Sequence, residues 1–169
     1  RYLLTKKEQL MTQLFSKDSV FVSNADSKEA VLTEVSEALV KAGYVKDNFL
    51  EHVLDREKNF PTALSLSNIS ETYPNVAVPH TEPEFVNTTK IVPVKLTNPI
   101  VFQNMSSPHK DLPVEFLFVI LNGTKATQVH LLSDLIVFFE KQDKAELEKF
   151  FKLTDTDAIY EYLQANFKK

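Results

Sequence analysis

Apolar residues recur three or four positions apart in several stretches of the chain, a pattern that is typical of amphipathic helices. In the first stretch the apolar stripe runs from Val31 to Val40, and Gly43 follows where a helix C-cap is expected. Asp26 is the expected N-cap, with Glu29 completing a capping box three residues later. Further helices are predicted over residues 46–59, from about 127 to 139, over 144–151 and over 158–167.

Short apolar runs rich in β-branched and aromatic residues lie between these helices and predict strands. The runs are 20–22 as an edge strand, 76–78, 90–102, and 114–121 as a central strand that ends in the turn Asn122-Gly123. Pro93 interrupts the third run and favours an edge position or a bulge there. Residues 62–70 are polar and predict a loop. Alternating helices and buried strands predict an α/β layered sandwich, a mixed β-sheet flanked by helices on both faces.

The length of 169 residues suits one domain with a sizeable core, and 43% hydrophobic with 25% charged residues is an ordinary globular balance. Residues 1–10 do not look like part of a core, and Met11 follows them. We therefore expect residues 1–10 to be an N-terminal extension and residues 11–169 to form a single domain.

Composition excludes several classes of function. The formal net charge is −4 and the chain has no basic stripe, which argues against nucleic-acid binding. The absence of cysteine excludes disulfides, thiol catalysis and cysteine-rich zinc sites. No apolar run approaches the ~20 residues that cross a membrane, so we expect no direct membrane insertion. The two glycines, Gly43 and Gly123, are too few for a glycine-rich phosphate-binding loop.

His80 is the first candidate for chemistry, because Pro79 should end the strand at 76–78 and leave His80 on the loop that follows. Imidazoles titrate near neutral pH, so the neutral, nucleophilic form is available. From the residues alone, His80 could equally be a partly buried loop histidine without a function. A metal site of His80, Glu82 and Glu84 is a minor alternative, since Pro83 interrupts it and no HExxH motif supports it.

Two further side chains are candidates, each with a plain structural alternative. Arg56 lies near the end of a predicted helix, where spacing favours a surface ion pair with Glu57 or Asp55 over a phosphate contact. His130 is expected early in the helix from about 127, with Asp134 four residues later in a position to orient its ring.

The alternative for His130 is a helix-surface histidine near an acid. His109 lies in the turn sequence Pro108-His109-Lys110-Asp111 and is expected to be simply exposed.

These residues together carry a family resemblance. Val76-Ala77-Val78-Pro79-His80 resembles the active-site motif of the fructose/mannitol-type (type 2) enzyme IIA domains of the bacterial sugar phosphotransferase system (PTS). The segments 55–62 and 11–15 are similar to the galactitol-type branch, and the resemblance covers about residues 11–169. The chain departs from the family pattern at Ala63, Tyr73 and Thr81.

The resemblance implies a phosphohistidine carrier in the cytoplasm. His80 would accept phosphate from the phosphocarrier HPr and pass it to a cysteine of enzyme IIB, which is expected as a separate chain. Arg56 and His130 would bind the phosphoryl oxygens, although galactitol-type members commonly lack the second histidine. No cofactor or metal is implied. The alternatives are a regulatory EIIA domain that signals through its phosphorylation state and a non-catalytic binding module.

Overall fold

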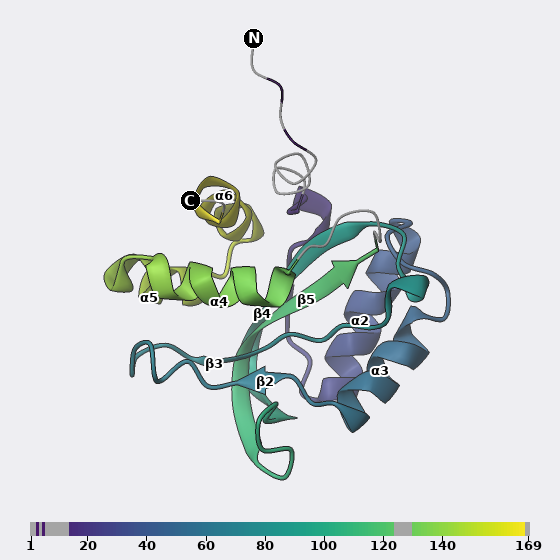
Figure 1. The fold of residues 1–169 in the computed structure, drawn as a ribbon, viewed down its shortest axis with the longest axis horizontal. Coiled ribbons are helices and arrows are strands. Elements are labelled where there is room, and N and C mark those ends of the chain that lie inside the picture. The colour runs from purple at the N-terminus through teal and green to yellow at the C-terminus, as the bar shows by residue number, and fades with distance from the viewer. Residues whose placement is uncertain (1–2, 4, 6–13, 124–129, 168–169) are drawn as a thin grey trace.

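The computed structural model describes residues 3, 5, 14–123 and 130–167 and contains a five-stranded sheet with strand order β1-β4-β5-β3-β2 (Figure 1). The strands are β1 (Phe21–Ser23), β2 (Ala63–Leu64), β3 (Asn75–Ala77), β4 (Thr89–Gln103) and β5 (Asp111–Asn122). β1 is parallel to β4 and β3 to β5, whereas β4–β5 and β2–β3 are antiparallel. The sheet is therefore mixed, as predicted.

Helices cover both faces of this sheet, which confirms the predicted α/β layers. On one face lie α2 (Lys28–Lys41) and α3 (Phe49–Asn59); on the other lie α4 (Leu131–Lys141), α5 (Lys144–Phe151) and α6 (Thr156–Asn166) (Figure 1). Two short 3₁₀ turns, η1 (Lys17–Ser19) and η2 (Pro83–Phe85), complete the elements. Among the described helices, none has the length and apolarity needed to span a membrane.

β5 separates two hydrophobic cores because successive side chains point to opposite faces of a strand. Phe116 and Phe118 pack with the core under α4–α6, while Leu117 and Val119 pack with the core under α2 and α3. All four side chains are at most 1% exposed. The central-strand prediction for residues 114–121 is therefore confirmed.

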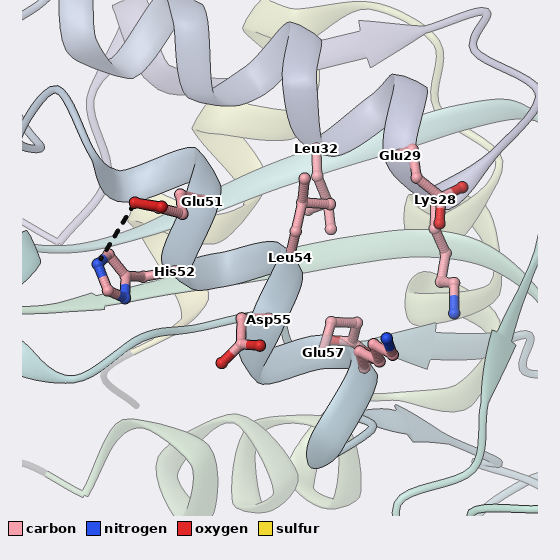
Figure 2. A pocket seen from close by; sticks show the side chains of 9 residues that line it. Lys28, Glu29, Leu32, Glu51, His52, Leu54, Asp55 and Glu57 are labelled. Atoms are coloured by element: carbon pink, nitrogen blue, oxygen red, sulfur yellow. Dashed lines mark ion pairs between the residues drawn. The ribbon is translucent and has the colours of Figure 1, made fainter.

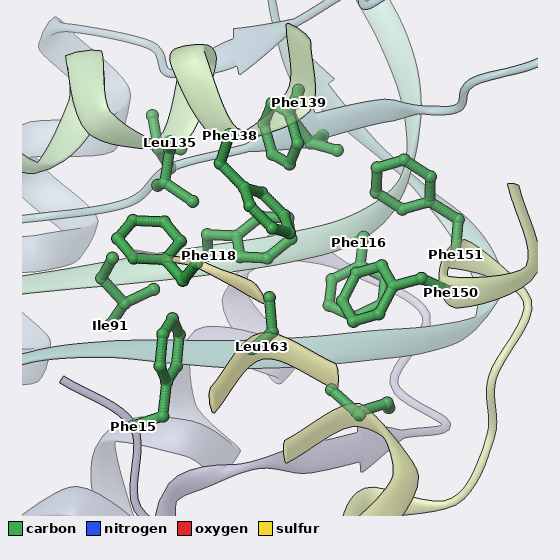
Figure 3. Close-up of a cluster of buried hydrophobic side chains, with 14 of the residues drawn as sticks. Phe15, Ile91, Phe116, Phe118, Leu135, Phe138, Phe139, Phe150, Phe151 and Leu163 are labelled. Carbon is green, nitrogen blue, oxygen red and sulfur yellow. The ribbon is translucent and has the colours of Figure 1, made fainter. Parts of the chain in front are cut away.

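Aromatic rings hold α4 and α5 against the sheet (Figure 3). The ring of Phe118 on β5 lies 5.4 Å from that of Phe139 on α4, and Phe116 lies 5.3 Å from Phe150 on α5, measured between ring centroids. Edge-to-face and offset contacts at such distances are favourable beyond the burial of area. This packing sets the place of α4, whose first residue follows His130.

The ends of α2 confirm one prediction and correct another. Gly43 has φ +81° and its N–H donates to Val40 O, so it is the left-handed residue that ends the helix, as expected. The N-cap is Ser27 rather than Asp26. The Ser27 hydroxyl accepts the N–H of Ala30 at 3.1 Å, because the chain is still extended at Ser27 and places that side chain over the first turn.

Other helix starts differ from prediction. α3 begins at Phe49 and not at Lys46, because the Lys46 N–H donates to Phe85 O and holds the chain in a loop. α6 begins at Thr156, two residues earlier than expected, with the Asp155 carboxylate accepting from Ala158 N–H. The described part of α4 begins at Leu131; the expected start near residue 127 lies outside the described residues, as do most of residues 1–10.

Pro93 does not mark an edge strand or a bulge. β4 lies between β1 and β5, Pro93 pairs with Phe118, and the register shift comes later, between Lys95 and Ile100. The Ile91 N–H, two residues earlier, donates to Leu14 O on the side away from β5, so the Pro93 nitrogen faces that side too. Pairing with β1 begins only at Val94, so no ladder bond is lost.

Candidate functional site

The backbone around His80 is held against the end of β5. The Pro79 carbonyl accepts the N–H of Ile120 at 2.9 Å, and His80 itself forms a parallel bridge with Ile120. The loop after β3 is therefore an extension of the parallel β3–β5 ladder, and the imidazole is carried by the central sheet.

One hydrogen bond fixes the chemical form of the His80 ring. Nδ1 lies 2.8 Å from the carbonyl oxygen of Val78, and a carbonyl can only accept. Nδ1 therefore carries the hydrogen in the neutral ring, and Nε2 keeps its lone pair. The half-buried ring thus presents Nε2 as a nucleophile.

A cavity of about 680 Å³ brings His80 and His130 together. It is lined by His80, Thr81, Pro83, Ile120, Asn122, His130, Leu131, Leu132, Ser133, Ile136 and Val137. Its walls come from the loop after β3, the end of β5 and the start of α4. The wall is mostly apolar, and the titratable groups among its described residues are the two histidines.

His130 is the exposed N-cap of α4 rather than a residue within the helix, with φ −100° and ψ 70°. Its carbonyl accepts the Asp134 N–H at 2.9 Å and the Ser133 hydroxyl at 3.0 Å. The Asp134 carboxylate was expected to orient the imidazole, but it does not contact that ring. Its buried Oδ2 has no hydrogen-bond partner within the described part of the chain. The His130 ring therefore lines the cavity without a contact to Asp134.

Arg56 lies in a neighbouring hollow of about 270 Å³ and not in the cavity of the two histidines. Its Nη1 is 2.8 Å from Oε2 of Glu82, two residues after His80, and its guanidinium lies 4.7 Å from the centre of the exposed Phe60 ring. Spacing favoured an ion pair with Glu57 or Asp55, and that expectation is wrong. Hydrogen bonds from its own backbone amide and then from Arg56 lower the pKa of Glu82.

Glu57 points inward and is only 3% exposed. Its two carboxylate oxygens accept the Thr62 hydroxyl at 2.8 Å and the Thr62 N–H at 2.9 Å. Burial raises the pKa of Glu57, and the Thr62 contacts partly oppose that shift. The sequence predicted Glu57 only as a surface partner of Arg56 within the segment 55–62 and did not predict that it points inward; the signal available was the Pro-Thr pair directly after the helix that carries it.

A third hollow, of about 770 Å³, lies between α2 and α3 and contains none of the three predicted site residues (Figure 2). Charged side chains line its rim, including Lys28, Glu51 and Asp55, and Leu32 and Leu54 lie between them. As to metals, the described residues contain no group of three or more histidine and acidic side chains placed to hold an ion. Glu82, a ligand in the minor metal alternative, is engaged by Arg56 instead.

Comparison with known families identifies the family of the chain. Residues 13–166 match the family model described as "Phosphoenolpyruvate-dependent sugar phosphotransferase system, EIIA 2". The chain belongs to this family. The PTS galactitol-specific EIIA component of Escherichia coli K12 is 26% identical over 136 residues, which is 80% of this chain and 85% of that protein.

Solved structures show the same fold. Mannitol IIA from E. coli matches with a TM-score of 0.65 and 24% identity, covering 88% of this chain and 98% of that one. Mannitol IIA in complex with phosphorylated IIB, also from E. coli, matches at 0.63 and 22%, covering 89% and 96%. The nitrogen regulatory IIA-Ntr of Neisseria meningitidis matches at 0.60 and 18%, covering 94% and 99%. The type-2 EIIA recognition made from the sequence is confirmed.

Proposed function

We propose that this EIIA-family chain is a phosphohistidine carrier that takes a phosphoryl group from HPr onto His80 Nε2 and passes it to a cysteine of enzyme IIB. The observation that carries the proposal is the 2.8 Å contact between His80 Nδ1 and Val78 O, which leaves Nε2 as the free nucleophile. Family membership supports a phosphotransfer role, and the family resemblance supplies HPr and IIB as partners.

The chemistry needs no proton transfer at His80. The Nε2 lone pair attacks phosphorus, the new N–P bond forms, and the bond from phosphorus to the donor atom of HPr breaks, with its electron pair returning to that atom. Nδ1 keeps its hydrogen, and the positive charge that develops on the ring is stabilised by the Val78 carbonyl. In the second step the IIB thiolate attacks the same phosphorus, and the electron pair of the N–P bond returns to Nε2.

His130 and Arg56 are assigned as donors to the phosphoryl oxygens. His130 shares the cavity of His80, so its ring is available to a phosphoryl group on Nε2. Arg56 uses Nη1 on Glu82, and a guanidinium has five N–H donors in all. The Glu82 contact holds Arg56 next to the segment that carries His80, where rotation of the guanidinium supplies donors to phosphate.

Partner proteins are proposed to dock over the apolar wall of the His80 cavity. Ile120, Leu132 and Ile136 line it, and Val137 is 43% exposed beside them. An apolar surface around a reactive group is suited to a protein partner that excludes water during transfer. The solved complex of a mannitol IIA with phosphorylated IIB supports a IIB acceptor for this fold.

The test is phosphorylation with phosphoenolpyruvate, enzyme I and HPr, followed by intact mass and site mapping. One acid-labile phosphoryl group on His80 is expected, absent in His80→Ala and kept in His109→Ala, the matched control in an exposed turn. Phosphate that survives His80→Ala moves the site elsewhere. If the wild type takes no phosphate while a known IIA does, the chain is a non-catalytic binding module.

A second arm addresses the regulatory alternative. The phosphorylated chain is purified and mixed with a type-2 IIB, and the IIB thiol is assayed for phosphate. Transfer to IIB supports the transport role, whereas a phosphorylated chain that no IIB discharges supports a regulatory one.

A further inference from the structure

A row of hydrogen bonds, buried from Glu57 to Val78, leads from α3 to the half-buried His80 ring. The Glu57 carboxylate accepts from Thr62 at 2.8 and 2.9 Å, and Thr62 Oγ1 accepts the Val78 N–H at 3.2 Å. The Val78 carbonyl in turn accepts His80 Nδ1–H at 2.8 Å. Glu57, Thr62 and Val78 are at most 3% exposed, so water does not compete for the bonds among these three residues.

The direction of each bond is forced by chemistry. The Val78 N–H can only donate, so the Thr62 hydroxyl accepts there and directs its own hydrogen to Glu57. Both Glu57 oxygens accept from donors of Thr62, an arrangement that suits the ionised carboxylate, which only accepts. Every hydrogen in the row therefore points from His80 toward the buried negative charge of Glu57.

We infer that Glu57 and Thr62 are positioning residues for His80, which hold Val78 so that its carbonyl fixes the Nδ1–H form and the orientation of the imidazole. The inference rests on the proposed function for its effect on phosphoryl transfer, but not for its effect on the ring itself. A misaligned Val78 carbonyl would release Nδ1–H, and the two neutral forms of imidazole would then mix.

The position of Val78 and the charge of Glu57 both contribute to the effect on the His80 ring. The Thr62 carbonyl also accepts the Val78 N–H, at 3.3 Å, so Val78 is held by two atoms of the same residue. The buried Glu57 carboxylate polarises this row of hydrogen bonds. The Val78 carbonyl thereby becomes a stronger hydrogen-bond acceptor for the His80 ring, which gains positive charge on phosphorylation. Arg56, next to Glu57 in the chain, points to the surface, where it contacts Glu82. One turn of α3 therefore carries both the residue that positions the His80 ring, Glu57, and the residue proposed to bind phosphate, Arg56.

The test measures the ring directly, in the unphosphorylated protein, by long-range ¹H–¹⁵N NMR of His80. The wild type is expected to show the Nδ1–H form, and Thr62→Val, which removes the hydroxyl but keeps the shape, a mixture of both forms. Thr62→Ser restores the hydroxyl and should restore the wild-type spectrum. Ser67→Ala removes an exposed hydroxyl nearby and is the matched control.

Phosphorylation by HPr is then timed in the same variants. Thr62→Val is expected to slow it about tenfold, the ratio expected for the loss of one buried hydrogen bond. Glu57→Gln, which keeps Thr62 intact, supplies a second variant if Thr62→Val does not fold. If both variants change in thermal stability while the His80 spectrum stays unchanged, Glu57 and Thr62 have a purely structural role and the inference is overturned.

The two proposals fail in different ways. If the wild type is not phosphorylated, the carrier function is overturned, yet the NMR comparison still decides whether Glu57 and Thr62 set the form of the ring. If phosphorylation occurs and the NMR spectra do not differ, only the positioning role is overturned.

Discussion

Replacing Phe139 by alanine should detach α4 from the sheet more than any surface change on that helix. Phe139 is fully buried, and its ring lies 5.4 Å from Phe118 and 5.9 Å from Phe151, between ring centroids. Truncating a buried phenylalanine to alanine costs about 3–5 kcal/mol, from lost transfer free energy and the cavity left behind.

That loss is large enough to measure without ambiguity. For a chain of this size each kcal/mol corresponds to roughly 2–4 °C in Tm, so the midpoint of thermal unfolding should fall by about 6–20 °C. With a urea m-value of about 2 kcal/mol/M, the urea midpoint should fall by about 1.5–2.5 M. The chain has no tryptophan, so unfolding is best followed by far-UV circular dichroism.

Glu140→Ala is the matched control, because Glu140 is the next residue on α4 and is exposed. It should change the free energy of unfolding by less than about 0.5 kcal/mol. A loss below about 1 kcal/mol for Phe139→Ala would refute the view that aromatic packing holds α4, and with it the place of His130, against the sheet.

Three further predictions concern single positions. Glu57→Gln should remove a pH dependence of stability. Because the pKa of Glu57 is raised in the folded protein, this carboxyl binds more protons in the native state than in the unfolded state above pH 4.5, its ordinary pKa value. The contribution of Glu57 to the free energy of unfolding is therefore greatest below that pH and is lost as pH rises. Urea unfolding of both proteins from pH 4 upward should show the wild type losing stability relative to the variant; a constant difference would contradict this. Gly43→Ala should cost about 1 kcal/mol, because φ is +81° while no atom lies within 4 Å of the added Cβ; a neutral effect would show that the helix end relaxes freely. Ser27→Ala should cost about 1 kcal/mol and Asp26→Ala much less, both by urea denaturation, and the reverse order would restore Asp26 as the cap.

Periodicity predicted the elements that bury a full stripe or a full strand. The α5 helix and the central part of β5 follow directly from the spacing of their apolar residues, because burial on one face requires that spacing. β2, only Ala63–Leu64, was predicted as loop. Two residues carry no period, and they form a strand only because β3 lies beside them.

Local chemistry located His80, since a proline that stops a strand leaves the next residue on a loop. It did not locate the partner of Arg56, because Glu82 is 26 residues away in sequence and only the fold brings the two together. Nor did it predict that Glu57 points inward: a glutamate beside an arginine on a helix is normally solvated, and its burial depends on Thr62 turning back to meet it.

The alternation of β5 between two cores also constrains how this lineage can change its length. Inserting or deleting one residue between Phe116 and Val119 would exchange the residues that face α2–α3 for those that face α4–α6, placing phenylalanines where smaller side chains now fit. Substitutions in β5 are therefore expected to accumulate over evolution, whereas insertions and deletions should be confined to segments such as 104–110, which is exposed over most of its length. Alignments of diverged homologues should show a gap-free β5 beside a turn of variable length.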